Sequence, residues 1–143
     1  MKRRVLIGLL ILMVILHGTA CLAEEAPQAQ TADGCAVDYG TSALFTREEM
    51  DAAIALIRTQ FEGFEGAHMR SLRYAGDASS SAENIAWMDQ LDEGVKHDAC
   101  MEFLCDFYSE GNEVLEPDTM YTDYQWWLGR AADGRIALLT WGY

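Results

Sequence analysis

The C-terminal end of the chain reads YTDYQWWLGRAADGRIALLTWGY over residues 121–143 and holds three of the four tryptophans. Two apolar, aromatic-rich runs flank Asp133 and Gly134, and an Asp-Gly pair supplies the positive φ angles of a type I′ turn. The pattern therefore predicts a β-hairpin with these two residues as its loop. In that register three pairs share one face of the hairpin: Trp126 with Trp141, Leu128 with Leu139, and Tyr124 with Tyr143.

A long helix is predicted to begin after Thr46. Thr46 and Glu49 form the pattern of a capping box, and Phe45 with Met50 forms that of a hydrophobic staple. Apolar residues then recur at helical spacing until Gly63 provides a stop: Met50, Ala53, Ile54, Ile57 and Phe61. A helix of this length is marginal in isolation, so its apolar stripe is expected to pack on the hairpin.

Three further elements are predicted between this helix and the hairpin. Residues 67–75 read as a strand, and charged residues on both of its faces indicate an edge position. Ser80 and Glu83 suggest a second capping box, followed by a short amphipathic helix. Strict alternation over residues 99–108 predicts a strand whose odd-numbered positions face the core.

Together the elements predict one α+β domain. One long N-terminal helix and a short second helix are expected on one side of a four-stranded, mostly antiparallel curved sheet. This order resembles the cystatin-like and nuclear-transport-factor-2-like (NTF2-like) folds, in which a long helix lies in the concave face of the sheet. The run LLTWGY at residues 138–143 also resembles the Trp-rich hairpins of small uncharacterised exported proteins and lipoproteins of Gram-positive bacteria. That resemblance implies no activity.

The N-terminus has the pattern of an export signal, with basic residues, an apolar run and then small residues. The apolar run over residues 5–16 falls short of the ~20 residues that a membrane-spanning helix needs. A cut after Ala23 makes residues 1–23 a signal peptide and releases a secreted protein. Alternatively, GTAC at residues 18–21 resembles a lipoprotein lipobox, with Cys21 lipidated and anchored to the outer face of the cell membrane.

Residues 24–34 lack large apolar side chains and are expected to form a disordered tether, which leaves residues 35–143 as a single small domain. Without Lys2, Arg3 and Arg4, seven basic residues remain against 23 acidic ones, a formal net charge of −16. This charge disfavours nucleic acid and anionic lipid headgroups and favours cationic partners. Membrane contact is therefore expected only through the signal or a lipid anchor.

The domain contains three cysteines, Cys35, Cys100 and Cys105. Cys100 and Cys105 are predicted to point to opposite faces of one strand, which excludes a disulfide between them. Cys105 is expected to be a buried thiol, and a bridge between Cys35 and Cys100 is the pairing that export permits. Three cysteines without CxxC spacing do not indicate a zinc or redox site.

The sequence contains neither a Gly-x-Ser-x-Gly nucleophile pattern nor a glycine-rich phosphate loop. His68 and His97 are expected to be surface histidines. The acidic loop near residues 110–118 lacks the EF-hand spacing and is expected to be a solvated loop. We therefore expect no catalytic residue, metal or cofactor.

Aromatic residues of the hairpin form the candidate binding surface. Four of them can line a pocket between helix and sheet or form an exposed patch: Trp127, Tyr121, Tyr124 and Tyr143. The leading hypothesis is an exported, non-catalytic domain that binds a protein, an envelope component or a small ligand through this surface. The alternative is a small enzyme or ligand-binding domain with a pocket between the first helix and the sheet, using Tyr124, Asp106 or His97 as polar groups.

Overall fold

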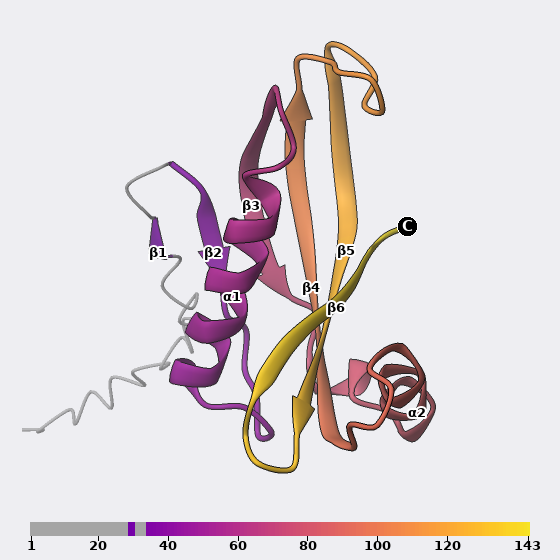
Figure 1. The fold of residues 1–143 in the computed structure, drawn as a ribbon. Helices are drawn as coiled ribbons and strands as arrows, with labels where there is room; N and C mark the ends of the chain where they lie inside the picture. The colour runs from indigo at the N-terminus through magenta and orange to yellow at the C-terminus, as the bar shows by residue number, and fades with distance from the viewer. Residues whose placement is uncertain (1–28, 31–33) are drawn as a thin grey trace, which may run out of the picture.

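The computed structural model describes residues 29–30 and 34–143 (Figure 1). The predicted signal sequence, Cys21 and most of the predicted tether lie outside these residues. The elements follow one another in this order: β1 (Ala29–Gln30), β2 (Ala36–Asp38), α1 (Arg47–Phe61), β3 (Ala67–Tyr74), the 3₁₀ turn η1 (Asp77–Ser79), α2 (Ala82–Leu91), β4 (His97–Ser109), β5 (Thr119–Ala131) and β6 (Ile136–Gly142).

The strands form one mixed sheet in the order β1-β2-β3-β4-β5-β6. β2 and β3 are parallel because α1 connects them as a crossover, and the other neighbours are antiparallel. The predicted α+β class is confirmed, whereas the predicted number of four strands is too low. β1 and β2 are only two and three residues long, too short for a recognisable period, and β1 falls within the predicted tether.

The prediction that residues 67–75 form an edge strand is wrong for the second half of β3. There, Val37 of β2 pairs with Leu72, while Cys105 of β4 pairs with Leu72 from the other side. Val37 and Leu72 are both completely buried. β3 is therefore an interior strand at this level, and its charged residue here, Arg73, lies on the outer face, where it pairs with Asp123.

The start of α1 is as predicted. Thr46 Oγ1 accepts the N–H of Glu49 at 3.2 Å, and Glu49 Oε2 accepts the N–H of Thr46 at 2.7 Å. Ser81, however, caps α2 in place of the predicted Ser80, because Ser81 Oγ accepts the N–H of Asn84. The Ser80 hydroxyl instead accepts the N–H of Cys100 at 3.0 Å and joins this segment to β4.

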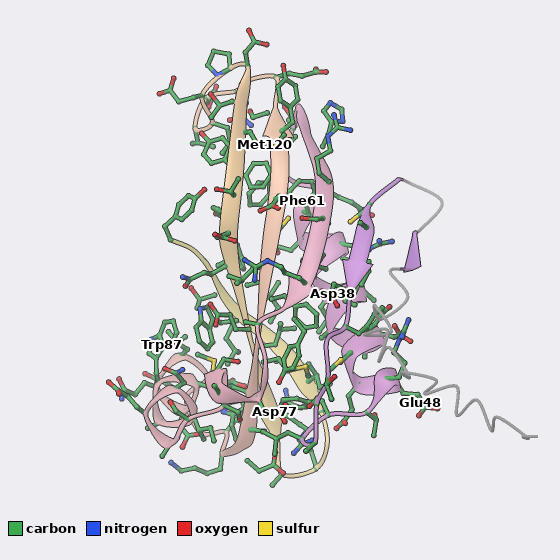
Figure 2. The ribbon with its side chains drawn as sticks, turned by 180° about the vertical axis from the view of Figure 1, so that it is seen from behind. Asp38, Glu48, Phe61, Asp77, Trp87 and Met120 are labelled. Carbon is green, nitrogen blue, oxygen red and sulfur yellow. The ribbon has the colours of Figure 1, made fainter. Side chains whose placement is uncertain are left out.

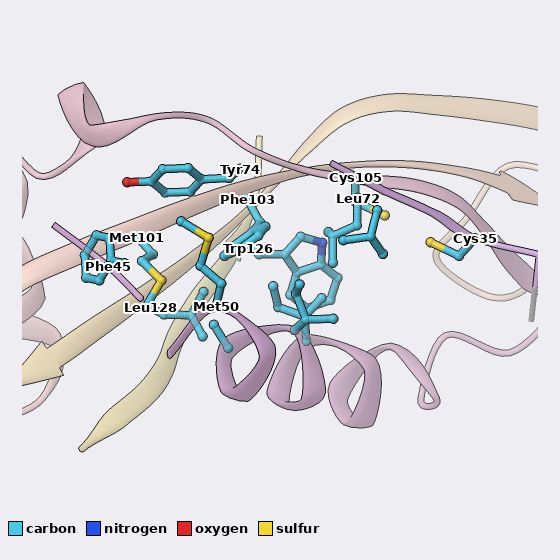
Figure 3. Packing of buried hydrophobic residues seen from close by; sticks show 14 of the residues in the cluster. Cys35, Phe45, Met50, Leu72, Tyr74, Met101, Phe103, Cys105, Trp126 and Leu128 are labelled. Carbon is cyan, nitrogen blue, oxygen red and sulfur yellow. The ribbon is translucent and has the colours of Figure 1, made fainter. Parts of the chain in front are cut away.

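The two helices cover opposite faces of the sheet, contrary to the prediction that both lie on one side. The larger core contains the apolar stripe of α1 and all five odd-numbered residues predicted for β4, and Figure 3 shows Trp126 packed between the sheet and α1. Met88 of α2 belongs to a second, smaller core with Cys100 and Trp127. Because β4 and β5 carry apolar side chains on both faces here, each face needs its own cover.

The predicted hairpin is present, but its loop has three residues rather than two. The Ala131 N–H donates to the carbonyl of Arg135 at 2.8 Å, and Gly134 has a φ of +85°. This shifts the register by one residue next to the turn, so that Leu128 faces Leu138 instead of Leu139. Leu139 is an extra residue of β6, a β-bulge that restores the predicted register from Thr140 onward.

The bulge divides two adjacent leucines between the two cores. Leu138 packs in the larger core under α1, and Leu139 packs in the smaller core with Met88 and Trp127. The prediction that Leu139 shares a face with Leu128 is therefore wrong, because a one-residue shift exchanges the faces of a strand. Beyond the bulge, Trp126 faces Trp141 as predicted, with ring centroids 5.8 Å apart.

Candidate functional site

Two predicted site residues, Tyr121 and Tyr124, lie three positions apart on β5. Strict alternation would place them on opposite faces of the sheet. The β4–β5 register shifts between them, because Cys105 pairs with Tyr124 and Phe107 pairs with Tyr121. Two steps along β4 thus match three steps along β5, and both tyrosine rings contact Phe107, at 4.8 and 5.4 Å between centroids.

Side chains on the outer face of the sheet hold this bulge. Asp123 has a φ of +56°, a left-handed conformation that is uncommon for a residue other than glycine. The N–H of Asp123 donates to Asp106 Oδ1 at 3.0 Å, and the Ser71 hydroxyl donates to Asp106 Oδ2 at 2.8 Å. The Asp123 carboxylate also pairs with the guanidinium of Arg73. The conformation that brings the two tyrosines together thus depends on β3 and β4.

A cleft opens on the inner face of β5 because β6 is shorter than its partner. Gly142 at the end of β6 pairs with Gln125, so β6 does not reach Tyr121 or Tyr124. The turn after α1 and the loop near residues 112–115 close other sides of a hollow of about 480 Å³, within the range of small-molecule sites. We call it the aromatic cleft, and ten residues line it: Gln60, Gly63, Phe64, Asn112, Val114, Leu115, Tyr121, Tyr124, Trp141 and Tyr143.

The ring of Tyr124 stands nearly at right angles to two other rings of the aromatic cleft. Tyr124 makes edge contacts with Phe64 (6.0 Å, 86°) and with Tyr143 (5.2 Å, 82°). Tyr121 stacks on buried Phe107, and Trp141 stacks on buried Trp126. Contacts with buried core rings thus hold Tyr121 and Trp141 in position. Trp141 and Tyr143 remain 39% and 75% exposed.

Two residues of the cleft, Asn112 and Tyr121, use their polar groups within the protein. Asn112 Oδ1 accepts the N–H groups of Val114 and Leu115, and Asn112 Nδ2 donates to the carbonyl of Glu65. The hydroxyl of Tyr121 accepts the N–H of Glu116 at 2.9 Å. Burial raises the pKa of Tyr124 above its usual value of 10.0, so its phenol is neutral at physiological pH. The cleft therefore offers mainly uncharged aromatic surface.

Three of the four predicted binding residues meet in this cleft, and Trp127 does not. Its side chain is buried on the opposite face of the sheet, with its ring 5.4 Å from that of Trp87. Its indole N–H donates to Gln125 Oε1 at 3.1 Å. Figure 2 shows Trp87 on α2, at the opposite end of the sheet from Met120. A recognition patch centred on Trp127 is therefore excluded.

The polar groups considered for an enzyme do not come together. Tyr124 lines the cleft, Asp106 holds the bulge from the outer face, and His97 lies beside α2. The prediction of a surface His97 is wrong, because its side chain is only 1% exposed. Carboxylates of α2 and the turn after it explain this burial: His97 Nδ1 lies 3.1 Å from Asp89 Oδ1, and Nε2 lies 3.6 Å from Asp92 Oδ2.

The predicted bridge between Cys35 and Cys100 does not form in this structure. Cys35 lies in the larger core, whereas Cys100 lies in the smaller core across the sheet, where its thiol donates to the carbonyl of Ser79 at 3.2 Å. Cys105 is completely buried, as predicted. Burial raises the pKa of its thiol to about 12, which makes it a poor nucleophile.

Sequence reasoning missed Phe64 and Trp141 as lining residues. Trp141 was predicted opposite Trp126, as observed, but that pairing does not show that the Trp141 ring lines a cleft. Phe64 lies in the turn after α1, and no periodic pattern marks it. Its position follows from the length of α1, which carries the chain to the end of β6.

Among residues 29–30 and 34–143, no helix is long and apolar enough to cross a membrane. The same described part of the chain contains no group of three or more His, Cys, Asp and Glu side chains arranged to hold a metal ion. Comparison of the chain with protein-family models, with curated proteins and with solved structures finds no match. Any functional assignment therefore rests on the site.

Proposed function

We propose that the chain is an exported, non-catalytic binding domain that takes its ligand in the aromatic cleft. The observation that carries this proposal is the convergence of Tyr121, Tyr124 and Tyr143 with Phe64 and Trp141 around one hollow of about 480 Å³. Large aromatic rings at the surface of a domain usually mark a binding site, because burying them against a ligand is favourable. The separation of Tyr124, Asp106 and His97 argues against the enzyme alternative.

A larger hollow of about 570 Å³ runs along α1, but it supports binding less well. Its lining is the outward face of the helix with Gly134 and Ile136, and no aromatic ring is among these described residues. Glu49, one of its carboxylates, already accepts from Thr46 and Arg130. We therefore assign ligand binding to the aromatic cleft.

Export and fold family are further parts of the proposal. The N-terminal signal pattern supports secretion or attachment to the outer face of the cell membrane through Cys21. The single long helix on one face of the sheet supports a cystatin-like or NTF2-like arrangement, although the parallel β2–β3 pair and the position of α2 depart from it. The likeness to exported proteins of Gram-positive bacteria is likewise a proposal.

NMR mapping with a library of small organic fragments tests the binding site. We expect fragment-induced shifts to cluster at Phe64, Tyr121 and Trp141, and Tyr143→Ala to weaken binding. Trp87→Ala is the matched control, because it removes an exposed aromatic ring from the opposite face. Shifts confined to the Trp87 side, or none at all, would overturn the assignment.

Export has its own test. Intact mass spectrometry of protein from its native cell envelope is expected to show either Glu24 as first residue or a diacylglyceryl group on Cys21. An intact N-terminus beginning at Met1 would contradict both forms of the proposal.

A further inference from the structure

The walls of the aromatic cleft have the chemistry of a cation site. Phe64, Tyr121, Tyr124, Trp141 and Tyr143 line it, and none of its lining side chains is a charged type. The face of an aromatic ring carries negative electrostatic potential, and a cation held against several such faces is attracted without a formal anion. Burial raises the pKa values of Tyr124 and Tyr143, so these two phenols preserve this property at physiological pH.

The geometry favours a compact group over a flat one. Tyr124 stands almost perpendicular to both Phe64 and Tyr143, at 86° and 82°. The rings that line the cleft therefore differ in orientation, which suits a roughly spherical group, whereas a planar ligand stacks best on a single open ring face. The hollow of about 480 Å³ has room for a small tetrahedral ion.

Carboxylates beside the cleft add charge complementarity. Glu65 and Glu113 line an adjoining hollow of about 250 Å³, which shares Gly63, Asn112 and Val114 with the cleft. Arg58 lines a third hollow together with Glu62 and Glu65, and this hollow shares Phe64 with the cleft. With a formal net charge of −13 for the full chain, the surrounding field attracts cations to this opening.

Hydrogen bonding within the cleft distinguishes between types of cation. A primary ammonium group needs up to three acceptors when it leaves water. The Asn112 amide is engaged at both its oxygen and its nitrogen, and the Tyr121 hydroxyl already accepts a backbone N–H. The other side-chain acceptors of the lining are the Gln60 amide and the hydroxyls of Tyr124 and Tyr143, so an ammonium group would have to reach these together. A fully methylated ammonium group has no N–H to satisfy and suits a wall of ring faces.

On these grounds, and resting on the proposed function, we propose that the aromatic cleft binds a quaternary methylammonium group of a small organic molecule. Choline is the probe with this chemistry. Its neutral isostere, 3,3-dimethylbutan-1-ol, has the same shape without the charge. Ethanolamine keeps the charge but carries three N–H donors.

Titration calorimetry with the three probes, on the full chain, tests the inference. We expect choline to bind about tenfold or more tightly than either ethanolamine or the neutral isostere. Tyr143→Leu is expected to weaken choline binding about tenfold, and because Tyr143 is 75% exposed, its loss should leave the core intact. Trp87→Leu, on the opposite face, is expected to leave choline binding unchanged.

The possible failures are distinguishable. Equal binding of choline and its neutral isostere, with both weakened by Tyr143→Leu, would overturn the cation inference and leave the proposed binding site in place. Equal binding of ethanolamine would overturn the preference for a methylated cation. Absence of choline binding would also overturn the cation inference, and the proposed function would fail only if the fragment mapping likewise left the cleft unoccupied.

Discussion

The carboxylate of Asp106 accepts the backbone N–H of Asp123 at 3.0 Å, and this bond holds the extra residue that turns Tyr121 and Tyr124 to the same face of β5. The inner wall of the aromatic cleft therefore depends on a hydrogen bond made on the outer face of the sheet. A substitution at Asp106 should therefore change the positions of Tyr121 and Tyr124 on the inner face of the sheet.

Asp106→Ala is expected to destabilise the fold by about 1–3 kcal/mol, because it leaves the Ser71 hydroxyl and the Asp123 N–H without their acceptor. It should also move the aromatic NMR signals of Tyr121 and Tyr124. Urea unfolding and aromatic spectra measure the two effects. Asp106→Asn keeps one oxygen acceptor, so it should lower the free energy of unfolding less and move the tyrosine signals less than Asp106→Ala does. Unchanged tyrosine signals in Asp106→Ala would refute the role of Asp106.

The left-handed backbone at Asp123 gives a second prediction about the same bulge. Asp123→Val is expected to cost about 1–3 kcal/mol, because a β-branched residue is strained at a φ of +56°. Asp123→Gly should be clearly more stable than Asp123→Val, although both variants lose the ion pair with Arg73. Equal urea midpoints for the two variants would show that the backbone is not held in this conformation.

Gly129 provides space for the buried ring of His97. A Cβ at this position would lie 2.4 Å from His97 Cδ2, and the ring is confined between Asp89 and Asp92. Gly129→Ala is therefore expected to lower the free energy of unfolding by about 1–3 kcal/mol through overpacking. Gly63→Ala is the control, because its Cβ meets nothing closer than 3.4 Å. Similar urea midpoints for both variants would be inconsistent with this packing.

Asp89 should make stability sensitive to acid. Hydrogen bonds from Lys96 and from the N–H of His97 lower the pKa of Asp89 from 3.8 to about 2. A lowered pKa means that the unfolded state takes up the proton first as pH falls. The stabilisation from Asp89 is therefore fully present above pH 3.8 and disappears as pH falls through about 2.

Urea unfolding at a series of pH values from 7 to 2 checks this sign, using Asp89→Asn for comparison. The parent protein should be more stable than the variant at neutral pH, and the difference should shrink toward zero at the acid end. A difference that stays constant with pH would mean that the charge of Asp89 is unimportant.

The bulge at Leu139 predicts which leucine couples to α2. A double-mutant cycle between Leu139→Ala and Met88→Ala should give a coupling energy of about 0.5 kcal/mol or more, because both side chains belong to the smaller core. The cycle between Leu138→Ala and Met88→Ala should be additive within about 0.5 kcal/mol, since Leu138 lies in the larger core. Coupling of Leu138, and not Leu139, to Met88 would contradict the bulge and would support a hairpin with a two-residue loop.

The amino-acid sequence alone predicts the elements that rest on local chemistry. The Thr46–Glu49 capping box lies within one turn of helix, and the alternation of residues 99–108 needs no partner strand, so α1 and β4 are as predicted. The Asp133-Gly134 signal identifies the hairpin, and the tyrosines of the binding site could be named from their place in it.

Tertiary contacts determine how these elements face one another. The extra residues Asp123 and Leu139 arise from cross-strand pairing, and each reverses the faces of the residues beyond it because side chains alternate with a period of two. The first brings Tyr121 beside Tyr124, and the second sends Leu139 to α2. Trp127 and His97 were mispredicted for a related reason: the helix that buries them is short, and the sequence does not show which face of the sheet it covers.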